Sequence, residues 1–130
     1  MEEIDAVHPY AELIGIRMES KGDGRCTCSV EFREALLNPN DVVHGGVIYS
    51  MADNSMGGAL QSLLKENEFC ATIEIKIMYL HAAGHSDLVC HSEVIKRGRR
   101  VAVLESDIYS AGKLVAKASG SFAVFYVEPA

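Results

Sequence analysis

The feature that most constrains this chain is one long apolar helix followed by a series of alternating strands. Residues 45–66 carry apolar side chains at helical spacing, so we predict a helix over that range. A hairpin is predicted before it over residues 15–32, with its turn at residues 21–24. Four segments with period-two alternation follow the helix: residues 72–80, 87–96, 100–109 and 113–127. A helix between a hairpin and a three- or four-strand meander predicts an α+β fold, with an antiparallel sheet curled around a central helix.

Length and charge limit the classes of protein to which this chain can belong. Its 130 residues can bury one core, so we predict a single domain over residues 1–130. The net charge of −6 argues against a general nucleic-acid binder, which needs a basic surface. No run of residues approaches the roughly 20 apolar positions of a membrane span, and residues 1–10 lack the apolar segment of a secretory signal. We therefore expect a cytoplasmic protein with no nucleic-acid or membrane partner.

Cysteines and histidines form no metal-binding pattern in this sequence. No C-x-x-C pair occurs among the four cysteines, Cys26, Cys28, Cys70 and Cys90. We expect all four to be reduced residues that pack in the core. Three histidines follow the helix segment at His81, His85 and His91. Their spacing falls across a turn and a strand, with no carboxylate motif to complete a metal shell, so neither a metal nor a cofactor is expected.

Asp53 interrupts an otherwise apolar helix. Helical periodicity groups the apolar side chains into one stripe: Val47, Ile48, Met51, Ala52, Met56, Ala59 and Leu63. Asp53 lies opposite this stripe, among the uncharged residues Tyr49, Gly57, Leu60 and Leu64. A helix that is apolar nearly all round is covered on more than one side. Because one sheet covers one side, we expect a second subunit on the other, with Asp53 at or beside the interface.

The predicted helix begins with His44, Gly45 and Gly46, and the usual capping residues Ser, Thr, Asp and Asn are missing there. The first N–H groups of a helix have no partner within it and carry partial positive charge, so this end can hold an anion or a developing oxyanion. Asp53 lies eight residues beyond Gly45, about 12 Å along the axis, too far for both to act on one carbon within one helix. Antiparallel packing against a second copy would bring them together. The alternative is a flexible turn and a carboxylate that is merely hydrogen-bonded.

Asn38, the His44-Gly45-Gly46 run and Asp53 resemble, in type and spacing, the motif of the hotdog-fold acyl-CoA thioesterases of the PaaI type. Residues 72–83, TIEIKIMYLHAA, are similar to the segment that follows the helix in this family, where a proline usually occupies the position of Ala82. The resemblance covers nearly the whole chain and implies a hotdog fold. It also implies a homodimer as the minimal unit, often assembled into a homotetramer.

The resemblance further implies hydrolysis of an acyl-CoA thioester at a site shared by two subunits. In this family's scheme the Gly45 N–H polarises the thioester carbonyl. Asp53 of the opposite chain acts either as the nucleophile or as the general base on a water molecule. The Asn38 amide binds the carbonyl or positions the water.

Three further residues receive roles from the same resemblance. Thr72 matches a position where a hydroxyl orients the water or the acid. His44 either contacts the sulfur or only shapes the loop, and Gly46 is expected to contribute to substrate binding. For the acyl group, the sequence is compatible with an aryl or a medium-chain pocket lined by Tyr49, Met56 and Leu60.

The stretch KRGRR, residues 96–100, is locally basic on an acidic protein. It holds four of the twelve Lys and Arg residues. We expect Arg97 and Arg99 to contact the phosphates of coenzyme A, although a solvated turn is the other reading. Two alternative functions also stay open: a hotdog hydratase or dehydratase acting on acyl thioesters, and a non-catalytic acyl-CoA-binding protein.

Overall fold

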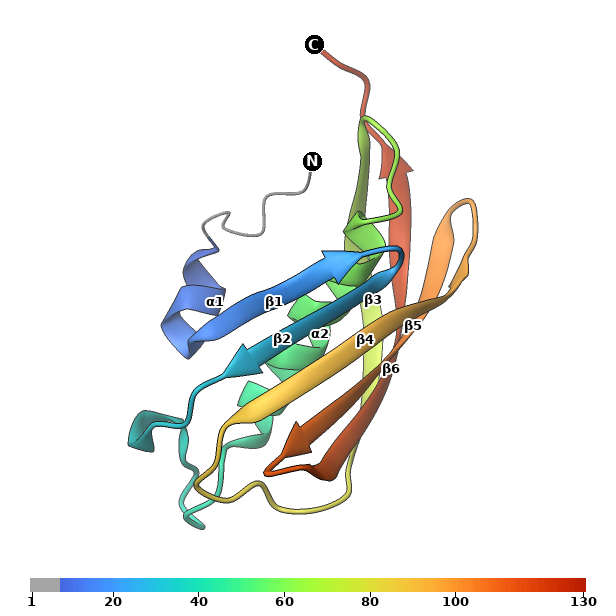
Figure 1. The fold of residues 1–130 in the computed structure, drawn as a ribbon. Coiled ribbons are helices and arrows are strands. Elements are labelled where there is room, and N and C mark those ends of the chain that lie inside the picture. The colour runs from blue at the N-terminus through green and yellow to red at the C-terminus, as the bar shows by residue number, and fades with distance from the viewer. Residues whose placement is uncertain (1–7) are drawn as a thin grey trace.

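The computed structural model describes residues 8–130, in which six antiparallel strands curve around one long helix (Figure 1). Residues 1–10 were expected to lack a secretory signal, and most of this stretch, residues 1–7, lies outside the described range. The helices are α1 (Pro9–Ile14) and α2 (Gly45–Gln61), with a short 3-10 helix, η1 (Glu34–Leu36). The strands are β1 (Ile16–Gly22), β2 (Arg25–Val30), β3 (Glu68–Tyr79), β4 (Leu88–Arg97), β5 (Val101–Ser110) and β6 (Lys113–Tyr126). The predicted α+β layout, a sheet around a central helix, is confirmed.

The strands follow the order β1-β2-β4-β5-β6-β3 across the sheet. Only β4, β5 and β6 form a sequential meander, because β3 crosses to the far edge and pairs with β6. The predicted hairpin pairs β1 with β2 through a turn in which Asp23 and Gly24 both have positive φ. One long strand, β3, therefore forms a free edge of the sheet among the described residues.

The boundary between α2 and β3 differs from the prediction. The helix ends at Gln61, five residues before the predicted end, and β3 begins at Glu68, four residues before the predicted start. The Ser62 hydroxyl donates to the carbonyl of Ala59 and accepts from the N–H of Gly24, both at 2.7 Å. These side-chain bonds compete with continued helix and tie its end to the β1–β2 turn.

The apolar stripe of α2 packs onto the concave face of the sheet, as predicted for most of its residues. Val47, Ile48, Met51, Ala52, Met56 and Ala59 are all buried. Leu60, expected on the same side of the helix as Asp53, is fully buried. The prediction for Leu63 was wrong, because this residue lies beyond the helix end and is 38% exposed. Met78 is half exposed because strand alternation turns it to the outer face of β3.

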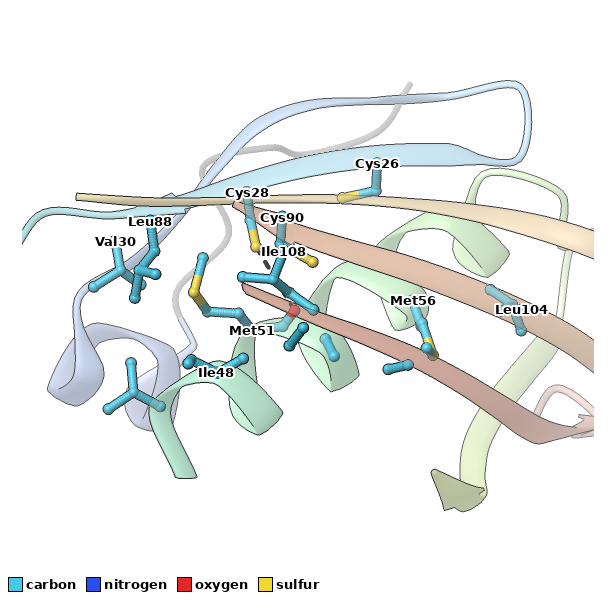
Figure 2. Close-up of a cluster of buried hydrophobic side chains, with 14 of the residues drawn as sticks. Cys26, Cys28, Val30, Ile48, Met51, Met56, Leu88, Cys90, Leu104 and Ile108 are labelled. Carbon is cyan, nitrogen blue, oxygen red and sulfur yellow. Dashed lines mark hydrogen bonds between the residues drawn. The ribbon is translucent and has the colours of Figure 1, made fainter. Parts of the chain in front are cut away.

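Buried thiols fill the space between α2 and strands β2 and β4 (Figure 2). Cys28 and Cys90 lie directly opposite one another on these strands, and the Cys28 thiol contacts the carbonyl of Met51 at 3.7 Å. All four cysteines are free thiols, and Cys26, Cys28 and Cys90 are buried in the core as predicted, whereas Cys70 is only half buried. Burial raises the pKa of Cys26 to about 11, and a hydrogen bond with Cys90 together with burial raises the pKa of Cys28. Since the thiolate is the nucleophilic form, Cys26 and Cys28 serve as packing residues.

Candidate functional site

The loop before α2 is organised by the side chain of Asn38. Its Oδ1 accepts hydrogen bonds from the N–H groups of Asn40 at 2.8 Å and Val42 at 3.3 Å. The backbone N–H of Asn38 also donates to the carbonyl of Val42 at 2.8 Å. Within residues 8–130 the amide Nδ2 has no hydrogen-bond partner. Asn38 thus uses its carbonyl oxygen to shape the loop and keeps a donor available.

The start of α2 is capped by His44, contrary to the prediction of an uncapped end. Its Nδ1 accepts the Gly46 N–H at 2.8 Å. Histidine is not among the common capping residues, so nothing in the residue pattern indicated this cap. An accepting Nδ1 places the proton of the neutral ring on Nε2. The bond also occupies the Gly46 N–H, so this amide offers no free donor to a substrate, and the expected substrate-binding role of Gly46 stays a prediction.

Gly45 lies against Tyr79, a residue to which the sequence analysis gave no role. The Tyr79 hydroxyl donates to the Gly45 carbonyl at 2.8 Å. A Cβ on Gly45 would lie 3.1 Å from both Cζ and Oη of Tyr79, so a side chain there would displace the ring. The Gly45 N–H itself has no partner among the residues that the structure describes. The involvement of Tyr79 becomes visible only in the folded chain, where the end of β3 contacts the start of α2.

These residues line a groove of about 540 Å³ at the start of α2. We call it the amide groove and define it by Asn38, His44, Gly45, Gly46, Tyr79 and His81. The unpartnered Gly45 N–H and the amide of Asn38 give it two donors, and the positive end of the helix dipole adds to them. Its chemistry suits a carbonyl oxygen that gains negative charge.

Asp53 and Thr72 lie together at a second place. The Thr72 hydroxyl donates to Asp53 Oδ1 at 2.7 Å, which joins β3 to the outer side of α2. Both residues line a groove of about 530 Å³ between α1, α2 and β3. We call it the acid groove and define it by Asp53, Thr72, Met18, Gly57, Cys70 and Phe122. Side chains of Glu12, Arg17 and Gln61 also line it.

The two grooves share no residue within one chain. Gly45 and Asp53 belong to the same rigid helix, so the helical rise separates them by about 12 Å. A single carbon atom cannot contact both. The structure thus brings Asn38, His44 and Gly45 together and, separately, Asp53 and Thr72.

Arg97 is held in an ion pair instead of being displayed to solvent. Its guanidinium contacts Glu68 Oε1 at 2.6 Å, and the two side chains are only 20% and 17% exposed. It also donates to the carbonyl groups of Gly98 and Arg99. The Lys65 N–H and the Arg97 guanidinium lower the pKa of Glu68. Arg97 therefore ties the β4–β5 turn to β3, which corrects its expected role, and neither it nor Arg99 lines the two grooves.

The histidines after α2 have separate surroundings. His81 lines the amide groove, His85 contacts Asp41 at 3.0 Å, and His91 contacts Thr27 at 2.9 Å. Over residues 8–130, no three His, Cys, Asp or Glu side chains converge on a position that could hold a metal ion. No helix in the described part of the chain has the length and apolar character to span a bilayer.

Comparison with known proteins assigns the family. Residues 40–117, which include His44 to Gly46, α2 and β3 to β5 but not Asn38, match the family described as the thioesterase superfamily. The chain belongs to the thioesterase superfamily. A relative from Saccharolobus solfataricus, named "Putative esterase SSO1253", is 30% identical over 87% of this chain and 75% of its own length. Membership makes the protein a thioester hydrolase.

Solved structures agree with this superfamily assignment. The conserved protein PA5202 from Pseudomonas aeruginosa is 34% identical, with a TM-score of 0.88 over 92% of this chain and 95% of that one. The phenylacetic acid degradation protein PaaI from Thermus thermophilus, in a mutant form, shares the fold at 22% identity, with a TM-score of 0.82 over 89% and 98% of the two chains. The predicted hotdog fold is confirmed, and the resemblance to PaaI holds at the level of the fold.

Proposed function

We propose that this thioesterase hydrolyses acyl-CoA at a site shared by two copies of the chain. The observation that carries the proposal is the division of chemistry between the two grooves. The amide groove offers donors for a carbonyl oxygen and no carboxylate, whereas the acid groove offers Asp53 and Thr72 at a distance from those donors. Each groove is therefore one half of a reactive site, which we call a half-site. A complete site forms when the Asp53 of one copy faces the Gly45 of the other.

The free edge of β3 and the uncovered side of α2 provide the contact for such a dimer. An edge strand presents unpaired N–H and C=O groups that can pair with another strand, and β3 is 12 residues long. Its Ile73 is 55% exposed, and Tyr49 on the nearby side of α2 is 37% exposed. Antiparallel pairing of β3 with its copy would bring the two α2 helices alongside each other in opposite directions. We expect this dimer as the minimal unit, with a homotetramer built from two such dimers.

The reaction follows from the groups that meet at such a site. The thioester oxygen accepts the Gly45 N–H and the Asn38 amide, and both bonds strengthen as the oxygen gains negative charge. Asp53 of the partner subunit either attacks the carbonyl carbon or removes a proton from an attacking water. In both routes the C–S bond breaks, and the sulfur leaves with the bonding electrons and takes up a proton. If Asp53 attacks, an anhydride between Asp53 and the acyl group forms and water then hydrolyses it, which restores the carboxylate. If Asp53 acts as the base, the attacking water itself supplies the second oxygen of the acid.

The acid groove is the place we propose for the acyl group. Met18, Cys70 and Phe122 give it an apolar lining beside Asp53, which suits an aryl or a medium-chain acyl group. Met56 and Leu60, expected at this position, are fully buried in the core instead. Among the residues expected in this role, only Tyr49 remains accessible.

Arg99 is the residue of the β4–β5 turn that we propose to bind coenzyme A phosphates. It is exposed, whereas Arg97 is committed to Glu68. The Arg99→Ala variant is expected to raise KM for an acyl-CoA and to leave KM unchanged for the matching acyl-pantetheine, which has no nucleotide. Equal KM changes for both substrates would exclude a phosphate contact.

The activity is tested by measuring thiol release from a panel of aryl- and medium-chain acyl-CoAs. Asp53→Asn keeps the size of the side chain and the acceptor for Thr72 but removes the charge. We expect it to lower kcat by at least about a hundredfold. Wild-type turnover in this variant would exclude the role of Asp53.

Sharing of the site between subunits is tested by mixing two inactive variants. A dimer of one Asp53→Asn chain and one Asn38→Asp chain contains one site with both substitutions and one site with neither. Mixing equal amounts and allowing exchange should restore about a quarter of the wild-type activity, because half of the dimers are mixed and each has one intact site. If each site lies within a single chain, mixing restores nothing.

A further inference from the structure

We infer that Tyr79 is a positioning residue that fixes the backbone at Gly45, so that the Gly45 N–H points at the substrate carbonyl. This inference rests on the carbonyl-binding role proposed above for that N–H. Tyr79 lies at the end of β3, 34 residues from Gly45 in the chain, and its hydroxyl reaches the Gly45 carbonyl at 2.8 Å.

Two peptide groups flank Gly45, and three of their four polar groups are held. The His44 carbonyl accepts from the Val47 N–H at 3.0 Å, and the Gly46 N–H donates to His44 Nδ1 at 2.8 Å. The Gly45 carbonyl accepts from Tyr79 at 2.8 Å. The fourth group, the Gly45 N–H, has no partner within residues 8–130. The arrangement leaves one donor free and fixes its direction through the other three groups.

Such fixing is needed because glycine rotates freely about its backbone bonds. Two consecutive glycines can adopt many conformations, so an oxyanion-binding amide at this position needs external restraint. His44 restrains the peptide between Gly45 and Gly46 from its N–H end, and Tyr79 restrains it from its carbonyl end. The Tyr79 ring also lies against Gly45, with Cζ 3.1 Å from the position a Cβ would occupy.

The hydroxyl of Tyr79 is suited to remain a donor. Partial burial of the ring, which is 51% exposed, raises the pKa of Tyr79, and the nearby Tyr49 phenol acts in the same direction. A raised pKa keeps the hydroxyl protonated to higher pH than in a free tyrosine, so the bond to the Gly45 carbonyl persists across the neutral range.

The placement of Tyr79 also links the two half-sites through one strand. β3 carries Thr72, which contacts Asp53, and Tyr79, which contacts Gly45. In the proposed dimer, each β3 thus positions the acid of one site and the amide of the other.

The test is the Tyr79→Phe variant, which removes the hydroxyl and keeps the ring. We expect kcat for acyl-CoA to fall about tenfold with KM changed less than twofold, because the substrate does not bind the hydroxyl itself. Amide hydrogen exchange at Gly46, followed by NMR, should accelerate because the peptide loses the restraint that Tyr79 places on its carbonyl end. Tyr126→Phe serves as the control, since this tyrosine is 59% exposed near the end of the chain and should change neither readout.

Unchanged kcat in Tyr79→Phe, or a rise in KM that accounts for the whole loss, would overturn the inference. The proposed function is judged separately by Asp53→Asn. If that variant loses turnover while Tyr79→Phe keeps it, the function stands and the positioning role falls. If Asp53→Asn stays active, the proposed function is wrong. In that case hydrogen exchange still tests Tyr79 by itself: an unchanged exchange rate at Gly46 in Tyr79→Phe would show that Tyr79 does not restrain this peptide.

Discussion

Thr72 donates a hydrogen bond of 2.7 Å to Asp53 Oδ1, and the two residues are 19 positions apart in the chain. The bond joins the edge strand β3 to α2 and holds one oxygen of the carboxylate in a fixed direction. The other oxygen, Oδ2, has no partner among the described residues, and Asp53 lines the acid groove. A carboxylate held by one oxygen in this way can present the other to a water molecule or to a carbonyl carbon.

Replacing Thr72 by valine should therefore slow the reaction. The substitution keeps the shape of the side chain and removes the donor to Asp53. A hydrogen bond to a charged group contributes about 1.5–3 kcal/mol, so a loss of about 10- to 100-fold in kcat is expected. Thr72→Ser should retain most of the activity, since it keeps the hydroxyl. Kinetics of thiol release compare the two variants, and equal activity in both would show that the bond has no part in the reaction.

Two substitutions can separate the loop-shaping oxygen of Asn38 from its amide donor. Asn38→Asp keeps an oxygen for the N–H groups of Asn40 and Val42 but removes the amide donor and adds a negative charge. We expect a folded protein with kcat reduced by at least about a hundredfold. Asn38→Ala removes both functions and should also lower the free energy of unfolding by about 1–2 kcal/mol.

Urea denaturation and thiol release measure the two effects of the Asn38 variants. The prediction fails if Asn38→Asp retains wild-type kcat. It also fails if both variants are equally destabilised, because the loop would then not depend on the oxygen of this side chain.

The sequence was sufficient to predict the fold and to single out several residues that line the two grooves, among them Asn38, Gly45 and Asp53. Apolar periodicity defines α2 and the strands, and the motif of Asn38, Gly45 and Asp53 has a spacing that can be read locally. Contacts between distant segments could not be read in this way. Tyr79 acts on Gly45 across 34 residues, and an alternating strand pattern gives no sign of that contact.

Arg97 is a second residue whose role depends on a contact between distant segments, and here the sequence suggested a role that the contact changes. In the sequence it is one of four basic residues in a short stretch, which is typical of an exposed charged turn. Its partner Glu68 is 29 residues away and reaches it only because β3 crosses to the far edge of the sheet. The role of Arg97 thus depends on the order of the strands in the sheet, which the alternation of apolar residues along each strand does not specify.

The ion pair of Glu68 and Arg97 predicts a specific dependence of stability on pH. The Lys65 N–H and Arg97 lower the pKa of Glu68 in the folded protein. A lowered carboxyl pKa contributes stability that is present above the unfolded-state pKa and is lost as pH falls through the folded-state pKa. The difference in stability between wild type and Glu68→Gln should be largest near neutral pH and should shrink on acidification.

Thermal unfolding of wild type and Glu68→Gln over a range of acidic to neutral pH checks this expectation. Asp23→Asn, a change in the exposed β1–β2 turn, controls for general charge effects. A difference between wild type and Glu68→Gln that stays constant with pH would contradict the assigned cause.

Gly57 and Gly58 are neighbours in α2 and should respond in opposite ways to alanine. Alanine is favoured over glycine inside a helix by about 1 kcal/mol. A Cβ on Gly57 would lie 4.0 Å from Phe122, an ordinary contact, so Gly57→Ala should raise the free energy of unfolding by about that amount. A Cβ on Gly58 would lie 2.9 Å from Cys26 Sγ and 3.0 Å from Met18 Cε, so Gly58→Ala should gain nothing or destabilise the protein.

The same substitution at Gly57 tests where the acyl group binds. Gly57 lines the acid groove beside Asp53, so an added methyl group narrows the space proposed for the acyl chain. Gly57→Ala should therefore lower kcat/KM for aryl- and medium-chain acyl-CoAs by several-fold, while acetyl-CoA, if it is turned over, is affected less. The stability measurement separates this effect from misfolding, since the variant is expected to be the more stable protein. An equal loss for short and long acyl groups would place the acyl chain outside the acid groove.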